Sequence, residues 1–355
     1  MTSTEAWTST TTPSEIAARL RGAGRVLVVT HMKPDGDAAG SSLGLARAIN
    51  LMPGKRAEVA YAGPMPAWLH PLREGTPTRI WERDGGPTEE PDAIVVIDTG
   101  SWSQLEAFRA YVEPRAARAI IIDHHRRGDA GVAAARWIDV EAAAACQMAA
   151  GVCCLLLGCL PEHLPHEVAA PLYLGLATDT GWFRHSNVTA DVMRLAGDLL
   201  EAGVDANALY QTVEQQDTPA RLRLLARALA SLSIEENGRI GIVRITRRDM
   251  AETGAGASET GGFVDLPQTI ASVKASVFLS EADPAEYSLP AGSPLTKVSV
   301  RTKTDLIDAD VACRALGGGG HRRAAGARVR GTLDEAAAQI LAALAPMVRA
   351  MEQRR

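Results

Sequence analysis

Short runs of hydrophobic residues alternate with helical patterns through the first half of the chain. Four runs rich in β-branched residues predict buried strands, at 25–30, 57–62, 91–98 and 118–123. The spacing of small and apolar residues predicts helices over 38–52 and 141–160, and a further apolar segment covers 171–183. Strands that are apolar throughout and separated by helices are typical of a parallel sheet with helices on both faces. This half of the chain is therefore predicted to be an α/β domain.

The pattern changes in the second half. Residues 190–232 are helical and charged, whereas several strand-like segments and a last helix, capped by Thr332 and Glu335, follow residue 233. A chain of 355 residues exceeds what one compact core usually holds. We therefore expect three parts: an α/β domain at 13–200, a helical linker at 201–232 and a smaller α/β domain at 233–350.

Composition places the chain among globular proteins. Apolar residues make up 46%, charged residues 22%, and the formal net charge is −5. The apolar stretches are too short to span a bilayer, and residues 1–12 lack the basic start and apolar core of a signal peptide. We interpret residues 1–12 as a floppy tail and expect a cytoplasmic protein that does not bind membranes.

The charge is unevenly distributed along the chain. Mild overall acidity argues against a protein that coats long nucleic acid, which would carry a basic stripe. From residue 301 onward, however, there are ten Lys and Arg residues against six Asp and Glu. A locally basic C-terminal domain is suited to a small phosphorylated ligand.

Four of the five cysteines fall within one apolar segment, residues 146–159. Their spacing matches no zinc-binding template, and their neighbours are Leu, Val and Ala. We favour reduced thiols in the protein core over a metal cluster.

Acidic and imidazole side chains follow several of the apolar segments. They are His31, Asp35, Asp37, Asp98, Asp123, His124, His125 and Asp179. Because the carboxyl ends of parallel strands lie along one edge of a sheet, we expect four strand ends, including one at Asp179, to bring these side chains into one crevice. Each motif alone could be a turn or a helix cap, but four independent occurrences favour a shared site.

So many carboxylates cannot share a small space unless cations neutralise them. Oxygen and imidazole ligands suit Mn²⁺, Mg²⁺, Fe²⁺ or Zn²⁺, and the lack of thiolates argues against a structural zinc site. Two ions bridged by a carboxylate and a hydroxide would use all the ligands. Such a pair activates water and clamps a phosphoryl group.

The motifs resemble those of a known family. "HMKPDGDAAGS", "VVIDTG", "IIIDHH" and "ATDTGWFRHSN" are similar, in order, to the four motifs of the DHH phosphoesterases. "VSVRTK" followed by "ALGGGGHRRAAGARV" resembles the family's C-terminal substrate-binding DHHA1 domain with its GGGH signature. The resemblance spans residues 31 to 327, and the two-domain layout is similar to the nanoRNase and pAp phosphatase branch.

The resemblance implies a role for each site residue. His31 and Asp35 would hold one Mn²⁺, while Asp37, His124 and Asp179 would hold the other. Asp98 would bridge both ions, Asp123 would orient a metal ligand, and His125 would face the scissile phosphate. Substrate binding is implied for residues of the second domain, across an interdomain cleft: Arg301, Gly318, Gly319, Gly320, His321 and Arg322. Mg²⁺ or another divalent cation would also suit the site.

Two local points stay open. After Asp98, "TGSWSQL" holds no second acid, so the substrate contacts there are undefined. "RHSN" at 184–187 could contact substrate or cap the helix that begins near Thr189.

We therefore expect a manganese-dependent phosphoric ester hydrolase that cleaves short oligoribonucleotides and 3′-phosphoadenosine 5′-phosphate (pAp) by a two-metal hydroxide mechanism. One alternative is a phosphodiesterase for cyclic or linear dinucleotides such as c-di-AMP or pApA. An inactive nucleotide-binding module is disfavoured by the intact ligand set, and a pyrophosphatase by the GGGH segment and its arginines. The expected partners are short RNA or a small nucleotide, and a homodimer stays open.

Overall fold

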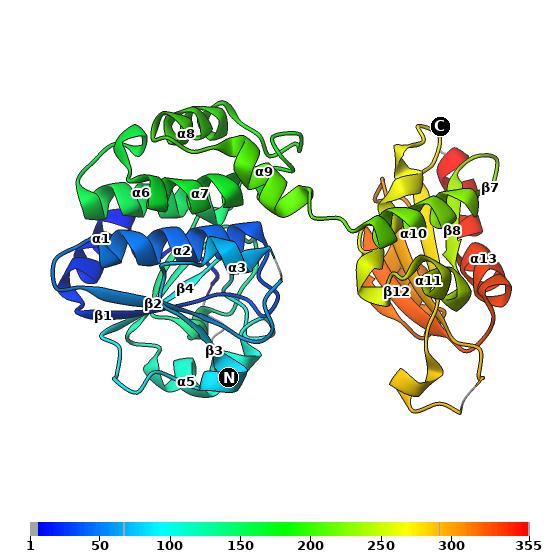
Figure 1. Cartoon of the computed structure of the whole chain (residues 1–355), viewed down its shortest axis with the longest axis horizontal. Helices are drawn as coiled ribbons and strands as arrows, with labels where there is room; N and C mark the ends of the chain where they lie inside the picture. The colour runs from blue at the N-terminus through cyan, green and yellow to red at the C-terminus, as the bar shows by residue number, and fades with distance from the viewer. Residues whose placement is uncertain (1–5, 67, 291, 354–355) are drawn as a thin grey trace. The chain divides into compact units, whose positions relative to one another are not determined.

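The computed structural model describes residues 6–66, 68–290 and 292–353. The chain forms two compact units, one ending at Gln216 and the other beginning at Asp217 (Figure 1). The two helices at the centre of the expected linker fall in different units: α9 (Ala206–Glu214) belongs to the first and α10 (Pro219–Ala230) to the second.

The first unit contains a six-stranded sheet in the order β3-β2-β1-β4-β5-β6, and every pair of neighbours is parallel. The strands are β1 (Arg25–Val29), β2 (Arg56–Tyr61), β3 (Thr78–Ile80), β4 (Ala93–Ile97), β5 (Ala119–Asp123) and β6 (Ala135–Ile138). The four predicted strands are confirmed as the inner ones. The two edge strands were not predicted, because they are short and lack a continuous apolar run.

Helices cover both faces of this sheet (Figure 1). Val26 and Val28 of β1 pack in one core, while Leu27 and Val29 pack in the core on the other face. The first core includes residues of α1 (Pro13–Gly22), α2 (Gly36–Asn50), α6 (Ala145–Leu157), α7 (His166–Asp179) and α8 (Ala190–Glu201). The second includes residues of α5 (Glu106–Val112), and Trp81 of the one-turn helix α4 (Trp81–Asp84) packs against it. The one-turn helix α3 (Leu69–Leu72) contributes Leu69 to the first core. Burial on both faces explains why the inner strands are apolar throughout.

The expectation of a strand ending at Asp179 is wrong. Residues 166–179 form α7, which packs against α2, α6 and α8. From Val168 to Ala177 every residue except Ala170 is buried. A helix enclosed on all sides shows no 3.6-residue periodicity and looks like a buried strand in sequence.

Glycines allow α2 and α7 to pack closely. Gly36, Gly40 and Gly44 recur every four residues and share one face of α2. A Cβ at Gly40 would overlap the carbonyl oxygen of Pro171, and one at Gly36 would overlap the Thr178 side chain. The close approach brings the start of α2 next to the end of α7, where two of the expected metal ligands lie.

The N-terminal segment, where described, is not a floppy tail, so that interpretation is wrong for residues 6–12. The Thr10 amide donates to the Arg136 carbonyl at 2.7 Å, and the Arg136 amide donates to Thr10 Oγ1 at 2.9 Å. The Ile138 amide donates to Ser9 Oγ at 2.8 Å, and Thr12 caps α1. The exposed edge of β6 needs hydrogen-bond partners, and this segment supplies them.

The cysteines are all free thiols. Cys146 and Cys153 are buried, Cys154 and Cys159 are half-buried, and burial raises the pKa of each thiol. Among the described residues, no cysteine belongs to a group that could bind a metal. The prediction of reduced core thiols is confirmed.

The second unit has its own sheet, in the order β11-β12-β10-β9-β8-β7, antiparallel except for β8 with β9. Its strands are β7 (Ser233–Glu235), β8 (Ile240–Ile245), β9 (Ala275–Glu281), β10 (Thr296–Thr302), β11 (Gly319–His321) and β12 (Ala324–Val329). One face packs against α12 (Ala309–Arg314) and α13 (Leu333–Glu352), and the other against α10 and α11 (Arg247–Thr253). This confirms the predicted smaller α/β domain.

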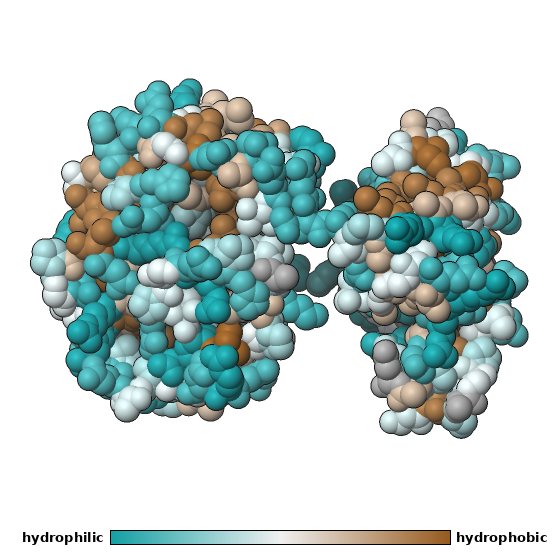
Figure 2. Space-filling model, viewed as in Figure 1, coloured by the Kyte–Doolittle hydropathy of each residue, from teal (hydrophilic) through white to brown (hydrophobic). Residues whose placement is uncertain are grey.

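Hydrophobic side chains gather on the surface of the second unit near α10 and β7 (Figure 2). Leu222 and Leu229 of α10 and Ile234 of β7 are exposed. Within the described ranges, no helix is both long and apolar enough to cross a membrane.

Candidate metal centre

The six expected ligands meet at the carboxyl edge of the parallel sheet. They follow β1, β4 and β5, begin α2 or end α7: His31, Asp35, Asp37, Asp98, His124 and Asp179. The candidate ligand atoms fall into three groups, in each of which all atoms lie within 4.8 Å of one another. The first set is His31, Asp35 and Asp98, and the second is Asp37, His124 and Asp179; a third group, Asp98, His124 and His125, shares one residue with each set. The first two sets correspond to the ligands expected for the two ions.

Asp98 lies between the two sets. Its Oδ2 is 3.4 Å from Nε2 of His31, and its Oδ1 is 3.3 Å from Nε2 of His124. The side chain is buried, and Oδ1 has no hydrogen-bond partner in the described part of the chain. Its backbone φ of 61° is strained for a residue other than glycine. Asp98 thus combines a strained backbone with a buried carboxylate that turns one oxygen toward each set. This arrangement fits a bridging ligand.

The N-terminus of α6 fixes the orientation of Asp37. The Ala145 amide donates to Asp37 Oδ2 at 2.6 Å, and the Cys146 amide donates to Oδ1 at 2.8 Å. Burial, with the nearby Asp98 and Asp179, raises the pKa of Asp37 well above its ordinary value. Burial likewise raises the pKa of Asp179. Burial therefore disfavours the ionised form of these carboxyls, and a bound cation would stabilise that form.

The same carboxylates raise the pKa of the two histidines among the expected ligands. Burial acts to lower the pKa of His31, but Asp35 and Asp98 raise it to about 10. Burial also acts to lower the pKa of His124, but Asp98 and Asp37 raise it to about 9. The pKa of Asp98 is lowered, because the two imidazoles outweigh the effect of its burial.

The backbone orients His124. Its Nδ1 lies 3.2 Å from the Ala142 carbonyl and donates to it, which leaves Nε2 facing the carboxylates. A ligand imidazole whose other nitrogen donates to a carbonyl is typical of metal centres.

Asp123 orients His125, which belongs to the third group, so the expected role of Asp123 in orienting a metal ligand stays a prediction. Its buried Oδ1 accepts from Nδ1 of His125 at 2.7 Å and from the His125 amide at 3.2 Å. The hydrogen bond to Asp123 raises the pKa of His125. The His125 side chain is 55% exposed and is therefore accessible to a substrate.

A cavity of about 370 Å³ adjoins the metal centre. Besides His31, Asp98 and His125, it is lined by polar residues that the sequence pattern did not single out: Ser101, Ser103, Gln104 and Arg127. Three of these four lie in "TGSWSQL", where the substrate contacts were left open. Hydroxyl, amide and guanidinium groups at this position provide donors for phosphate or ribose oxygens.

"RHSN" is partly explained by the fold. Asn187 donates to the carbonyls of Ala143 and Asp179 at 3.1 and 3.2 Å, and so ties the end of α7 to the residues before α6. The cap of α8 is Thr189 itself.

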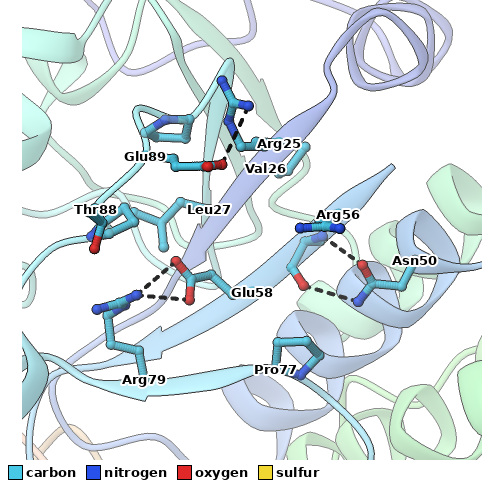
Figure 3. A pocket seen from close by; sticks show the side chains of 13 residues that line it. Arg25, Val26, Leu27, Asn50, Arg56, Glu58, Pro77, Arg79, Thr88 and Glu89 are labelled. Carbon is cyan, nitrogen blue, oxygen red and sulfur yellow. Dashed lines mark hydrogen bonds and ion pairs between the residues drawn. The ribbon is translucent and has the colours of Figure 1, made fainter. Parts of the chain in front are cut away.

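A second cavity, of about 470 Å³, lies at the opposite edge of the sheet (Figure 3). Its carboxylates are neutralised by arginines. Both oxygens of Glu58 accept from Arg79, at 3.3 and 3.2 Å, and Glu89 lies 3.5 Å from Arg25. No histidine is among the described residues that line it. Among the described residues, this cavity therefore holds no counterpart to the metal centre.

In the second unit, close backbone packing explains the glycine run. A Cβ at Gly318 would overlap the carbonyl oxygen of Gly326, and one at Gly320 would lie 2.6 Å from that of Ala324. The Gly318 amide donates to the Cys313 carbonyl and the Gly320 amide to Asp310. These two amides are thus engaged within the domain. Any contact of this run with phosphate depends on close approach and on the exposed His321.

The three arginines of this unit that the sequence singled out have acidic neighbours. Arg301 lies 3.9 Å from Asp265, Arg322 lies 3.2 Å from Asp308, and Arg323 lies 2.8 Å from Asp305. A cavity of about 410 Å³ is lined by the glycine run, Gly317–Gly319, together with Lys297 and Arg328. Sequence reasoning missed these two cations, because only the pairing of β10 with β12 brings them together.

The fold and the site define a two-domain α/β protein with a candidate two-metal centre, and the similar proteins identify its family. Residues 25–176 match the DHH family, N-terminal domain, and residues 237–349 match the DHHA1 domain. A bifunctional oligoribonuclease and PAP phosphatase NrnA from Thermus thermophilus is 30% identical, over 90% of this chain and 89% of that protein. The protein of the same name from Bacillus subtilis is 26% identical, over 86% and 89%.

A solved structure shows the same fold. An exopolyphosphatase-related protein from Bacteroides fragilis superposes with a TM-score of 0.81 at 23% identity, over 94% of this chain and 95% of that one. The chain belongs to the DHH family, with a C-terminal DHHA1 domain, and is a phosphoric ester hydrolase. The predicted family and enzyme class are confirmed.

Proposed function

We propose that the enzyme is manganese-dependent and hydrolyses short oligoribonucleotides and pAp. The observation that carries the proposal is Asp98, which turns one carboxylate oxygen toward each of two His and Asp sets. Two relatives named as oligoribonuclease and PAP phosphatase, matched over most of their length, support the substrate class.

Each residue of the centre has a role in this proposal. His31 and Asp35 would hold one ion, Asp37, His124 and Asp179 would hold the other, and Asp98 would serve both. When bound, the ions supply an activated water and stabilise charge on the phosphoryl oxygens. His125, fixed through Nδ1 by Asp123, donates from Nε2 to a phosphoryl oxygen.

In this proposal the second domain holds the distal part of the substrate. The proposed contacts are those expected from the sequence, Arg301, Gly318, Gly319, Gly320, His321 and Arg322, with Lys297 and Arg328 added by the cavity. Cationic side chains and a glycine surface suit a phosphate and a stacked base. A cytoplasmic location and the absence of long nucleic-acid partners belong to the same proposal.

A product assay with Mn²⁺ tests the proposal directly. The panel contains pAp, a linear diribonucleotide, a cyclic dinucleotide and pyrophosphate, each with wild type and Asp98→Asn. We expect AMP and phosphate from pAp, mononucleotides from the diribonucleotide, and neither reaction in the variant.

The other outcomes identify the alternatives. Turnover of the cyclic dinucleotide alone would make the enzyme a messenger phosphodiesterase, and turnover of pyrophosphate alone a pyrophosphatase. Nucleotide binding without any product would indicate an inactive module.

A further inference from the structure

We propose that Trp7 is a positioning residue of the active site, through which the N-terminal segment (residues 6–12) holds the two loops that carry Asp98 and His125. The inference deepens the proposed function, on which its activity measurements rest. Trp7 is not one of the six expected metal ligands and is not among the described residues that line the adjoining cavity, so its effect would pass through the loops.

Trp7 contacts both loops at once. Its Nε1 donates to the carbonyl oxygen of His125 at 3.0 Å. The indole ring lies directly against Gly100, two residues after Asp98, and Gly128, three residues after His125. A Cβ at either glycine would overlap the ring, and the three atoms nearest to each such Cβ all belong to Trp7. Both loops therefore have a glycine where the indole lies.

The loops are also tied to each other beside the indole. The Asp129 amide donates to the Gly100 carbonyl at 2.7 Å, and Asp129 Oδ2 accepts from the Trp102 amide at 2.7 Å. These bonds join the loops after Asp98 and His125 into one body. Trp7 adds a third attachment, which joins that body to the N-terminal segment.

The far end of the segment is firmly anchored. Ser9 and Thr10 form backbone and hydroxyl hydrogen bonds along β6, and Thr12 forms a capping box with Glu15 at the start of α1. A segment attached to the sheet edge at residues 9–12 carries Trp7 to a defined place. The segment that restrains the loops is therefore itself fixed to the sheet edge and to α1.

Covering the edge strand does not require the indole. The hydrogen bonds to β6 come from Ser9, Thr10 and Thr11. Trp7 extends beyond them, and its one polar atom binds the backbone of His125, whose imidazole is held by Asp123. His125 is thus fixed at both its carbonyl and its Nδ1, which restrains the direction of its Nε2.

Two substitutions distinguish the effect of the indole ring on kcat from the effect of its N–H group. Trp7→Phe retains an aromatic ring and removes the donor, so kcat should fall about two- to ten-fold, as for loss of one neutral hydrogen bond. Trp7→Ala removes both and should lower kcat by about ten- to a hundred-fold, as expected when a positioned group is displaced by about 1 Å. KM and Mn²⁺ stoichiometry should change little. Thr8→Ala, in the same segment, is the matched control and should behave as wild type.

A double-mutant cycle tests whether the indole acts through the loop. Gly100→Ala should displace the ring and lower kcat to the level of Trp7→Ala. If both changes act through one contact, Gly100→Ala with Trp7→Ala should be no slower than either single variant. Losses that multiply would overturn the proposal, as would wild-type kcat in Trp7→Ala.

Hydrogen exchange separates this inference from the proposed function. Trp7→Ala should increase amide exchange in residues 99–104 and 124–129 while the inner strands β1 and β4 keep their protection. This readout needs no substrate, so it stands even if the wild type hydrolyses nothing in the panel. Unchanged exchange in both loops would refute the positioning role, and a general loss of protection would show that the indole only stabilises the domain.

Discussion

At the scale of single residues, Asp123 shows how one buried carboxylate can orient an imidazole beside the candidate metal centre. Asp123→Asn retains the shape and removes the charge that holds Nδ1 of His125. A charge-assisted hydrogen bond contributes about 1.5–3 kcal/mol, so kcat on pAp should fall by about ten- to a hundred-fold. The six expected metal ligands are untouched, so Mn²⁺ titration should give the wild-type stoichiometry. Loss of Mn²⁺ binding would instead make Asp123 part of the metal centre.

His321 offers the parallel test in the second domain. It is exposed beside the glycine run and is not an expected metal ligand. His321→Ala should weaken use of pAp by about ten- to a hundred-fold, since one charge-assisted bond is lost. Steady-state kinetics checks the effect, with Mn²⁺ affinity as the control. Wild-type kinetics would exclude His321 from substrate binding.

Sequence predicted the residues of the metal centre better than those around it. His31, Asp98 and His124 follow apolar strands, so their convergence at the carboxyl edge was predictable. The contact of Trp7 with Gly100 and Gly128 was not, because it depends on where the chain runs over the sheet edge. The contact joins residues far apart in the sequence, and the local pattern of apolar and polar residues does not predict it.

At the scale of secondary-structure elements, the junction of α2, α6 and α7 determines whether Asp37 and Asp179 meet. A Cβ at Gly175 of α7 would overlap Cys146 Sγ and lie 3.0 Å from Asp37 Oδ1. Gly175→Ala should therefore destabilise the domain by about 1–3 kcal/mol, as overpacking does, and weaken Mn²⁺ binding. Gly151→Ala on α6 is the matched control, because nothing lies within 4 Å of its Cβ.

Thermal melting with and without Mn²⁺ checks this prediction. The control should match or exceed wild-type stability, since Ala favours a helix interior over Gly. Equal stability and equal Mn²⁺ affinity in the two variants would show that this packing does not position the ligands.

The same junction marks the limit of what the sequence predicts about elements. Inner strands were predicted because burial on both faces leaves continuous apolar runs. The identical signal in α7 arises from a helix enclosed by other helices, and only the three-dimensional packing distinguishes the two cases. The expected ligand Asp179 therefore lies beside Asp37 and His124, but it ends a helix and not a strand.

At the scale of the whole molecule, two domains with small cavities favour short substrates. The metal-side cavity is about 370 Å³ and the cavity beside the glycine run is about 410 Å³. The net charge of −5 provides no extended basic track. A 5-nucleotide RNA should be degraded faster than a 50-nucleotide RNA at equal concentration of ends, as seen by gel electrophoresis. Equal rates would contradict the proposed preference.

The central claim is that Asp98 joins two metal-binding sets into one catalytic centre, and metal stoichiometry tests it most directly. Mn²⁺ bound per chain is measured by calorimetry and elemental analysis, and pAp hydrolysis is followed on the same samples. The wild type should bind two Mn²⁺ ions per chain and hydrolyse pAp. Asp98→Asn should retain its fold by circular dichroism but lose tight binding of at least one ion, and turnover should fall by orders of magnitude, since its two oxygens face both sets. A wild type that binds only one ion, or an Asp98→Asn variant with wild-type binding and activity, would contradict the account.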